Sequence, residues 1–561
     1  MSRTKTAAKT AAATADQPAT MTTAEAAIAT MVRNGIDTLY CLPGVQNDMF
    51  FDALHGAQDR IRPIHTRHEQ STAYMALGAA MATGKPQAYA VVPGPGFLNT
   101  TAALSTAYAC NAPVMAMVGQ IQAATIGHNL GQLHEIPDQL AIMRGLTKWS
   151  ERITSPGDAP IKVTEAFRQM RSGRQRPVGL ECAIDVWGRK AAVALPPGPC
   201  AADVMAVDTD AAEAAAKLLG GAKNPMIFVG SGALDASAEV TRLSEMLQAP
   251  VVMGKMGRGV LDGRNPLALS TIEGHELWAH ADVVLAVGTR LLTPLQAWGT
   301  DAGLRIIRVD ADPDEIERVH KPALGIVGDA GPVLRAILAV LGKHSRKRAS
   351  RAAEMAEVHA RGNGTIARLE PQLSLLGAIR DALPEDGIFV DELTQLGYAA
   401  RISFPTYAPR TYISPGYQGT LGWGLGTALG VKAACPDKAV VSVTGDGGFL
   451  FQVQELATSV QHRIPIVIVL VNDGAYGNVR RIQATGYGNR LIASDLQNPD
   501  FMKLAGAFGV NGVRATTPDA LRKAMVKGFA ADVTTLIEVP AGVMPDPWSL
   551  IRQGRNRPKP A

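Results

Sequence analysis

The 561-residue sequence predicts an α/β protein made of three Rossmann-like, doubly wound parallel-sheet domains. The first observation is that short apolar runs alternate with helical stretches, as in βαβ units around a buried parallel sheet. The second is that the chain is far longer than one hydrophobic core supports. The third is that the alternation restarts twice, after the Pro/Gly-rich patch 196–199 and after the basic stretch 344–351.

These interruptions divide the chain into six segments. Residues 1–20 are rich in Ala, Thr and Lys and lack an apolar run, so we expect a disordered tail, with a cleaved targeting peptide as the alternative. Helical periodicity over 22–34 follows, with Thr22 or Thr23 as N-cap. We expect domains at 21–190, 205–343 and 366–545, a solvated linker at 344–365 and a basic C-terminal tail at 546–561.

Each domain contains four predicted strands, and the first and third regions look alike in pattern. The runs are 38–42, 88–92, 114–118 and 178–186 in the first domain, 226–229, 251–253, 283–287 and 306–309 in the second, and 388–390, 439–443, 466–471 and 535–539 in the third.

Composition excludes several classes of protein. A net charge of +5 is mild for this length, and no basic stripe is interleaved with aromatic residues, so nucleic acid is not an expected partner. The five cysteines have no paired spacing, which excludes a zinc site or a disulfide framework and fits a reducing cytoplasm. The longest apolar run, 464–471, is too short to span a membrane.

The strongest motif lies in the third domain. An apolar strand runs into Gly445-Asp446-Gly447, a helical segment follows, and the next strand ends at Asn472-Asp473-Gly474. Neighbouring parallel strands present their carboxyl ends at one edge, where α/β folds bind ligands. Carboxylate and amide oxygens suit Mg²⁺, and glycine-rich backbone at a helix start suits a diphosphate. Glycines around a lone Asp can also be a simple strand-to-turn connection.

With 24 residues between Gly447 and Asn472, this motif closely resembles the thiamine-diphosphate signature. The chain is identified as a member of the acetolactate synthase, pyruvate oxidase and benzaldehyde lyase-like superfamily. The resemblance implies a thiamine diphosphate cofactor and a Mg²⁺ ion held by Asp446, Asn472 and the main-chain oxygen of Gly474. It also implies that the three domains are pyrimidine-binding, central and diphosphate-binding.

A second motif supports the resemblance. Arg67-His68-Glu69 precedes a small-residue helix at 71–81, and VPGPGFLNT follows at 92–100. A glutamate at such a place can simply be favoured by the helix dipole. The resemblance implies instead that Glu69 hydrogen-bonds the aminopyrimidine and helps it to remove the C2 proton of the thiazolium. It further implies that the two halves of each site come from different subunits, so we expect a homodimer at minimum and a homotetramer as the favoured assembly.

Matching positions extend the expected cofactor site. Leu421 takes the place of the apolar side chain that props the bent cofactor, although core packing also explains it. The full expected set is Pro43, Gly44, Glu69, Asn99, Gln395, Gly419, Leu421, Gly445, Asp446, Gly447, Gly448, Asn472, Gly474, Ala475 and Tyr476.

Three stretches are expected to face the reacting carbon: 42–46, 133–135 and 472–478. Within them Gln46 and His134 are catalytic candidates beside Glu69. His134 stands where simple 2-oxo acid decarboxylases place a histidine, and could donate a proton or orient the substrate oxygen. A structural hydrogen-bonding histidine is the alternative.

The central domain gives a weak nucleotide signal. Gly230-Ser231-Gly232 does not complete a dinucleotide fingerprint. Gly288-Thr289-Arg290 matches the family's position near FAD, but Leu291-Leu292-Thr293 replaces the Phe-Asp-Asp of acetolactate synthases. A domain without bound FAD is therefore the favoured interpretation.

The resemblance implies a carbon–carbon lyase or carboligase acting on a 2-oxo acid or a hydroxy-ketone. Decarboxylation would be followed by protonation or by ligation to a carbonyl. Ordinary acetolactate synthase is disfavoured because the stretch directly after Tyr476, GNVRRIQATGYG, lacks the tryptophan that those enzymes carry there, and glyoxylate carboligase because Glu69 is present.

Three alternatives remain. One is a 2-hydroxyacyl-CoA lyase or oxalyl-CoA decarboxylase-like enzyme whose basic tail binds the CoA phosphates through Arg552, Arg555, Arg557 and Lys559. A frayed, solvated terminus is the simpler interpretation of these residues. The second is a flavin-linked 2-oxo acid oxidase. The third is a non-catalytic subunit, against which the intact Glu69, Asp446 and Asn472 argue.

Overall fold

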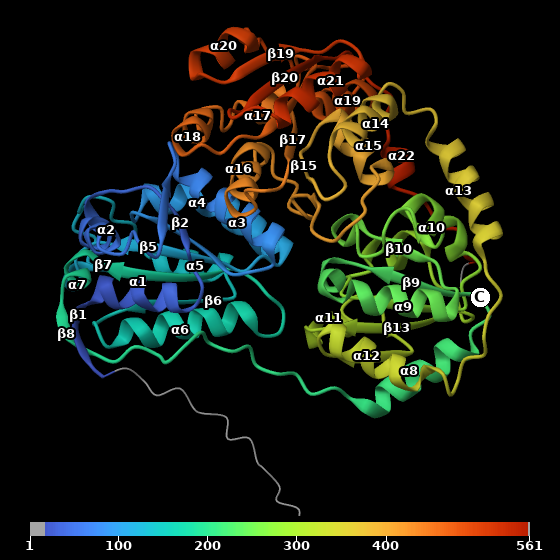
Figure 1. Cartoon of the computed structure of the whole chain (residues 1–561), viewed down its shortest axis with the longest axis horizontal. Helices are drawn as coiled ribbons and strands as arrows, with labels where there is room; N and C mark the ends of the chain where they lie inside the picture. The colour runs from blue at the N-terminus through green and yellow to red at the C-terminus, as the bar shows by residue number, and fades with distance from the viewer. Residues whose placement is uncertain (1–16, 559–561) are drawn as a thin grey trace, which may run out of the picture.

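The computed structural model describes residues 17–558 and contains three six-stranded parallel sheets, each flanked by helices. In Figure 1 the N-terminal domain lies at the left, the central domain at the right and the C-terminal domain above both. The three-domain α/β fold expected from the sequence is therefore confirmed.

The N-terminal sheet has the order β3-β2-β4-β5-β7-β6. A separate antiparallel pair, β1 and β8, closes the domain. The strands are β1 (Ala19–Thr22), β2 (Thr38–Cys41), β3 (Arg62–His65), β4 (Gln87–Val91), β5 (Val114–Gln120), β6 (Trp149–Ile153), β7 (Val178–Ala183) and β8 (Lys190–Val193). The helices are α1 (Thr23–Arg33), α2 (Asp48–His55), α3 (Glu69–Thr83), α4 (Pro95–Cys110), α5 (Gln139–Leu146), α6 (Asp158–Arg171) and α7 (Ile184–Trp187).

The central sheet has the order β11-β10-β9-β12-β13-β14. Counted along the domain this is 3-2-1-4-5-6, the order of dinucleotide-binding Rossmann sheets. The strands are β9 (Pro225–Val229), β10 (Val251–Met253), β11 (Ala268–Leu269), β12 (Val283–Val287), β13 (Arg305–Asp310) and β14 (Leu324–Val327). The helices are α8 (Thr209–Gly221), α9 (Ser237–Leu247), α10 (Thr271–Trp278), α11 (Pro313–Glu317) and α12 (Ala330–Leu341).

The C-terminal sheet has the order β16-β15-β17-β18-β20-β19, which repeats the 2-1-3-4-6-5 order of the N-terminal sheet. The strands are β15 (Ile388–Asp391), β16 (Tyr412–Ile413), β17 (Val440–Gly445), β18 (Val467–Asn472), β19 (Asn511–Arg514) and β20 (Thr535–Pro540). The helices are α13 (Ala352–Ile366), α14 (Gln372–Ala382), α15 (Gln395–Ser403), α16 (Gly424–Ala434), α17 (Asp446–Phe449), α18 (Glu455–His462), α19 (Gly477–Gly486), α20 (Phe501–Phe508), α21 (Pro518–Phe529) and α22 (Trp548–Ile551).

Several expected boundaries differ from the structure. Residues 19 and 20, assigned to the disordered tail, belong to β1, whereas residues 1–16 lie outside the described part of the chain. The run expected as a strand to residue 186 turns into α7 after Ala183. The expected linker contains α13, and its basic part is only partly solvated: Arg346 and Lys347 are exposed, whereas Arg348 donates to the carbonyls of Leu219, Gly220 and Ala222.

The C-terminal tail returns to the central domain, where Arg557 is buried. Its guanidinium donates to the carbonyl oxygen of Trp278 at 2.8 Å, to that of Ala281, and to Asp301 at 2.8 Å. Arg557 is therefore neither frayed nor free to bind a phosphate, whereas Arg552 and Arg555 are exposed and Lys559 lies outside the described residues.

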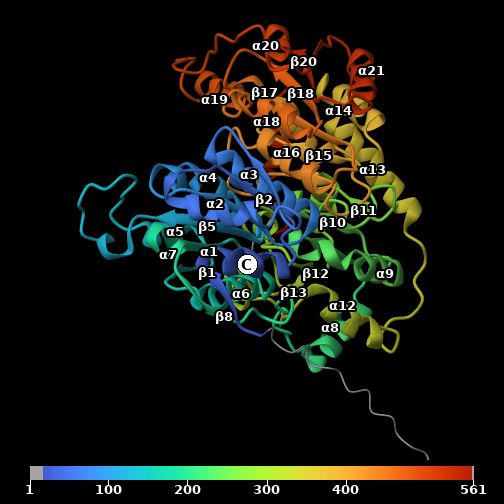
Figure 2. The same ribbon diagram turned by 60° about the vertical axis from the view of Figure 1, so that its left-hand side comes forward.

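Close helix packing joins the N- and C-terminal domains. At Gly78 of α3 and Gly430 of α16, an added Cβ would lie 2.1 Å from the Thr427 oxygen and 1.9 Å from the Met75 oxygen, so glycine permits the approach. This packing fixes the start of α3, where Glu69 lies. Figure 2 shows the loop 121–138 projecting from the N-terminal domain. Within residues 17–558 no helix is both long and apolar enough to cross a bilayer.

Candidate active site

The metal-site residues expected from the sequence meet at the carboxyl ends of β17 and β18. Asp446 begins α17 and is buried, and its Oδ2 accepts the backbone N–H of Gly474 at 2.9 Å. Asn472 ends β18, beside Gly445 at the end of β17 in the parallel register Gly445 to Val471. Gly474 has a φ of +66°, which glycine adopts without strain. The strand register therefore brings the three expected ligands together.

A residue missed by the sequence reasoning connects these ligands. Asn498 donates from Nδ2 to Asp446 Oδ2 at 2.5 Å and to Asn472 Oδ1 at 2.9 Å. Asn472 in turn donates from Nδ2 to Glu538 at 2.8 Å. The Asn498-Pro499 pair reads only as a turn in the sequence, so no local signal could have placed it here.

The oxygens of Asp446 and Asn472 thus converge on one small group, the Asn498 amide. Burial and the adjacent Asp446 carboxylate raise the pKa of Asp473 to about 6, so ionisation of Asp473 is disfavoured beside Asp446. One carboxylate, one amide oxygen and one carbonyl form a donor set that suits Mg²⁺. Among residues 17–558 no cluster of three or more His, Cys, Asp or Glu side chains offers a competing metal site.

Glycine-rich backbone surrounds this group. A Cβ on Gly447 would lie 2.7 Å from the Tyr476 ring, and one on Gly448 would lie 2.3 Å from Glu392, so both positions require glycine. Gln395 begins α15 and donates to Asp473 at 2.6 Å. Gly419 has a φ of +59°, and Ala475 is buried beside the metal ligands. These expected cofactor positions therefore line one edge of the sheet.

The buried carboxylate of Glu392 supports the turn that carries Leu421. It accepts the backbone N–H of Gly422 at 2.5 Å and the hydroxyl of Thr444 at 2.5 Å. Burial raises its pKa to about 7, and its hydrogen-bond donors oppose that rise. No local motif indicates Glu392, because its partners come from segments far along the chain.

The second half of the expected site lies in the N-terminal domain. Glu69 is the first residue of α3, and its Oε2 accepts the Asn99 amide at 3.0 Å. Asn99 stands in the first turns of α4, which begins at Pro95 after Gly94 in the left-handed region. The expected pairing of Glu69 with the 92–100 segment is thus present in space.

Gln46 and His134 form a hydrogen-bonded pair. His134 Nδ1 lies 3.1 Å from Gln46 Oε1, and Gln46 Nε2 donates to the Leu133 carbonyl at 3.0 Å. Gln46 is buried, and it follows Pro43 and Gly44 after β2. The two expected catalytic candidates therefore touch, although they lie far apart in sequence.

One buried carboxylate anchors both ends of the loop that carries His134. Glu181 accepts Gln120 at 3.2 Å and Gln139 at 2.9 Å, both on the same oxygen, and Arg152 at 2.6 Å on the other. Gln139 also accepts the Gly94 N–H at 3.0 Å. The sequence reasoning did not include this support.

Among residues 17–558, no hydrogen bond joins the Glu69–Asn99 or Gln46–His134 pair directly to the Asp446–Asn472 group. Neighbouring residues do meet, because Gln70 donates to the Phe451 carbonyl at 3.0 Å and the Thr106 and Thr420 hydroxyls lie 2.7 Å apart. Exposed apolar side chains lie close in the sequence to the first half (Val45, Leu98, Leu130 and Leu133) and to the second (Phe451, Val479, Ile482 and Ile492).

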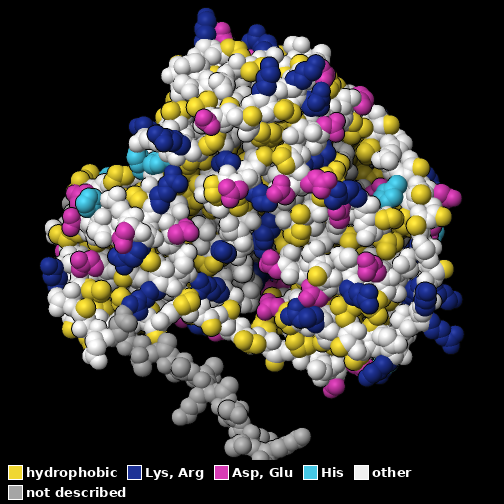
Figure 3. Space-filling model, viewed as in Figure 1, with side chains coloured by type: hydrophobic (Ala, Val, Ile, Leu, Met, Phe, Trp, Pro, Cys, Tyr) yellow, Lys and Arg dark blue, Asp and Glu magenta, His cyan; other side chains and the backbone are white. Residues whose placement is uncertain are grey.

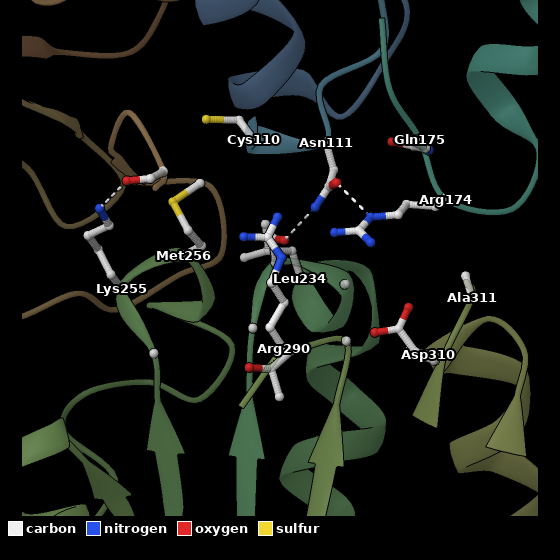
Figure 4. Close-up of a pocket in the computed structure, with 18 of the residues that line it drawn as sticks. Cys110, Asn111, Arg174, Gln175, Leu234, Lys255, Met256, Arg290, Asp310 and Ala311 are labelled. Atoms are coloured by element: carbon white, nitrogen blue, oxygen red, sulfur yellow. Dashed lines mark hydrogen bonds between the residues drawn. The ribbon is translucent and has the colours of Figure 1, made fainter. Parts of the chain in front are cut away.

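A cavity of about 780 Å³ lies where the three domains meet, at the carboxyl edge of the central sheet. Figure 3 shows a hollow between the lobes with basic side chains inside it. In Figure 4 Arg290 points from the central domain toward Asn111 and Arg174 of the N-terminal domain. Arg290 stacks on Tyr417 at 4.2 Å. Gly230 and Gly232 pack against the Gly288 backbone, so close loop packing by itself explains these glycines.

Comparison with known proteins decides the family. Residues 21–142 match "Thiamine pyrophosphate enzyme, N-terminal TPP binding domain", residues 212–337 its "central domain" and residues 394–539 its "C-terminal TPP binding domain". The chain is also 34% identical over 537 residues to a "Probable 2-ketoarginine decarboxylase" of Pseudomonas aeruginosa, covering 93% of this chain and 94% of that protein. The chain belongs to the thiamine pyrophosphate enzymes.

Other thiamine pyrophosphate enzymes are similar over nearly the whole length. A "Probable acetolactate synthase large subunit" of Methanocaldococcus jannaschii is 31% identical over 557 residues, covering 93% of each chain. A "Sulfoacetaldehyde acetyltransferase" of Rhodobacter capsulatus is 31% identical over 563 residues, covering 92% of this chain and 94% of that protein. The expected family and the expectation of a thiamine-diphosphate-dependent enzyme are therefore confirmed, within a group that includes acetolactate synthases and 2-oxo acid decarboxylases.

Proposed function

We propose that this thiamine pyrophosphate enzyme is a carbon–carbon lyase or carboligase that decarboxylates a 2-oxo acid. The acyl carbon left after CO₂ departs then receives a proton or joins a second carbonyl compound. The observation that carries the proposal is the convergence of Asp446 and Asn472 on one point, with glycine-rich backbone around them. Bound thiamine diphosphate supplies the carbanion and the electron sink that such a cleavage needs.

Each residue of the first half has a defined task in this proposal. Glu69 holds a proton at the aminopyrimidine ring, and Asn99 fixes the orientation of its carboxylate. His134, held by Gln46, faces the substrate and exchanges a proton at the carbonyl oxygen. The buried Gln46 sets the ring orientation, so the pair acts as one unit.

The second half would hold the charged end of the cofactor. Asp446, Asn472 and the Gly474 carbonyl would bind Mg²⁺, whose remaining positions suit phosphate oxygens. The Gly445–Gly448 backbone at the start of α17 would offer N–H groups to the diphosphate. Leu421, on the turn held by Glu392, would support the rings.

A second copy of the chain would complete each site, with a homodimer as the minimum and a homotetramer as the favoured assembly. Exposed apolar side chains next to the site residues, such as Leu98 beside Asn99 and Leu133 beside His134, would be covered in such an assembly. Co-expression of Glu69→Gln with Asp446→Ala chains tests it. If the halves come from different subunits, the hybrid dimer contains one intact site and regains activity. If each chain holds its own site, every site carries a substitution and the mixture stays inactive.

Product analysis by NMR tests the reaction itself. The purified protein would be incubated with thiamine diphosphate, Mg²⁺ and either pyruvate or 2-ketoarginine, the latter because a similar protein is named for it. We expect CO₂ release together with an aldehyde or a ligated hydroxy-acid, absent from a Glu69→Gln control. Cofactor binding without turnover of either 2-oxo acid would overturn the proposed substrate class.

We further propose that turnover requires no flavin. Leu291-Leu292-Thr293 differs from the family's flavin stretch, and Arg290 is stacked on Tyr417. The measurement is the visible spectrum of the purified protein, which should lack flavin absorbance while activity is retained. Flavin absorbance at equal molar amount, with oxygen consumed during turnover, would favour the oxidase instead.

The acyl-CoA alternative loses one of its expected phosphate-binding residues, because Arg557 is buried in the central domain. Free CoA should therefore not compete with the 2-oxo acid substrate. Inhibition by CoA at substrate-like concentrations would restore the acyl-CoA interpretation.

A further inference from the structure

We infer that Asn498 is a positioning residue of the metal site, which aligns Asp446 and Asn472 and thereby sets the affinity for the divalent cation. The inference rests on the proposed function, because it concerns the Mg²⁺ site that function requires. It goes further by assigning a role to a residue outside the three expected ligands.

The contacts of Asp446 carry the first step. Gly474 N and Asn498 Nδ2 both donate to Oδ2, at 2.9 Å and 2.5 Å. Two donors on one oxygen fix the rotation of the carboxylate and direct Oδ1 to the opposite side. A carboxylate held in this way offers a cation one defined oxygen rather than a rotating pair.

The contacts of Asn472 carry the second step. Its Nδ2 donates to Glu538 at 2.8 Å, and Arg514 Nε donates to the other Glu538 oxygen at 2.9 Å. Its Oδ1 accepts Asn498 Nδ2 at 2.9 Å. Because both ends of the Asn472 amide are bound, the oxygen must face the site, and its second lone pair can bind a cation.

The third expected ligand is held by the same segment. Leu496 N donates to the Gly474 carbonyl at 2.8 Å, and Tyr476 N donates to the Ser494 carbonyl at 2.8 Å. Residues 494–498 thus pair with 474–476 and give an N–H to an acceptor on each of the three ligands. The short side chain of Asn498 reaches two of them at once, which no other residue of the segment does.

This arrangement makes Asn498 an outer support of the metal. Support of this kind typically changes metal affinity by about 10- to 100-fold when it is removed. We expect Asn498→Leu, which keeps the branching and number of side-chain heavy atoms but removes both N–H donors, to weaken binding by that factor. The maximal rate at saturating metal should change far less, because none of the three ligands is lost.

Mn²⁺ titration followed by electron paramagnetic resonance tests the inference, with the full chain and thiamine diphosphate present. The free Mn²⁺ signal gives affinity without reference to turnover. Gln497→Leu is the matched control, since Gln497 is an exposed amide in the same segment. Asn498→Ala serves as a second variant that buries no new apolar group, and thermal unfolding verifies that each variant is folded.

Asp446→Ala separates this inference from the proposed function. Loss of Mn²⁺ binding in Asp446→Ala, weaker binding in both Asn498 variants and unchanged binding in Gln497→Leu would support the inference. Loss in Asp446→Ala with wild-type affinity in the Asn498 variants would overturn it and leave the metal site standing. Tighter binding in the Asn498 variants would also overturn it, because the amide would then compete with the cation. Unchanged binding in Asp446→Ala would instead remove the proposed metal site itself.

Discussion

Glu392 accepts a 2.5 Å hydrogen bond from the hydroxyl of Thr444, two residues before Asp446. This bond ties the end of β15 to the end of β17, and the bond from Gly422 adds the turn that carries Leu421. One buried carboxylate therefore connects the metal-site strand with the segment expected to support the cofactor rings. A substitution at Glu392 should therefore affect both the metal-site strand and the turn that carries Leu421.

Stability should depend on pH through Glu392. Folding raises its pKa from 4.5 to about 7, so the folded state favours the protonated form. The resulting contribution to stability is complete below the unfolded pKa and is lost as pH rises through the folded value. Between about pH 5 and about pH 8, wild type should lose stability relative to Glu392→Gln, which does not titrate. Urea unfolding of both proteins across that range measures the difference, and parallel curves would contradict the assignment.

Glu69→Gln should lower the turnover number by about 100-fold or more, the usual range for loss of a group that moves a proton. Thiamine diphosphate affinity should change only a few-fold, because the amide still hydrogen-bonds the ring. The measurements are steady-state rate and cofactor titration by fluorescence. Glu25→Gln, in the first turn of α1, is the control and should leave the rate unchanged. Equal rates in the two variants would exclude Glu69 from proton movement.

Gln46→Leu should impair catalysis through His134. The substitution removes the contacts with His134 Nδ1 and the Leu133 carbonyl, so the imidazole loses its fixed orientation. We expect kcat/KM to fall by about 10- to 100-fold and its pH profile to shift. Gln132→Leu, in the loop 121–138 that carries His134, is the comparison. A normal pH profile in Gln46→Leu would mean that His134 plays a structural part only.

Gln139→Leu should loosen the loop 121–138. The side chain supports both Glu181 and the Gly94 N–H, so its loss leaves buried polar groups short of partners and costs about 1–3 kcal/mol of stability. KM for the 2-oxo acid should rise as well. Gln372→Leu, an equally buried amide in the C-terminal domain, should lose similar stability without a change in KM. Urea unfolding and steady-state kinetics on both variants decide whether the loop effect is specific.

Arg557→Ala should destabilise the central domain by about 1–3 kcal/mol, because the carbonyls of Trp278 and Ala281 lose their donor. Arg552→Ala removes an exposed charge from the same tail and should change stability by less than about 0.5 kcal/mol. Thermal unfolding of the two variants gives the comparison. Equal melting temperatures of the two variants would show that the contacts of Arg557 do not stabilise the protein.

The sequence predicted the interior strands of every sheet and none of the edge strands. The twelve predicted runs are the four inner strands of each sheet, whereas β3, β6, β11, β14, β16 and β19 lie at the edges. Inner strands of a parallel sheet are covered on both faces and read as continuous apolar runs. The edge strand β19 is exposed along its whole length, so its sequence contains no such run.

The site residues also fall into two groups, those that local sequence predicted and those that it did not. Asp446, Asn472 and Gly474 lie directly at the ends of recognisable strands, so local sequence was enough to group them. Asn498 and Glu392 reach the site from segments 24 and 54 residues away from the nearest expected ligand in the sequence, Gly474 and Asp446 respectively. Their importance depends on how the loops fold back, which no spacing rule conveys. The residues that hold the ligands are therefore visible only in the structure.

The return of Arg557 to the central domain also constrains how the protein is made. Domains of a long chain generally fold in turn as they leave the ribosome. Here the central domain emerges more than two hundred residues before the segment that completes its hydrogen bonds at Trp278 and Trp298. Its last contacts must wait until Arg557 has been synthesised, so the nascent central domain lacks these hydrogen bonds during that interval.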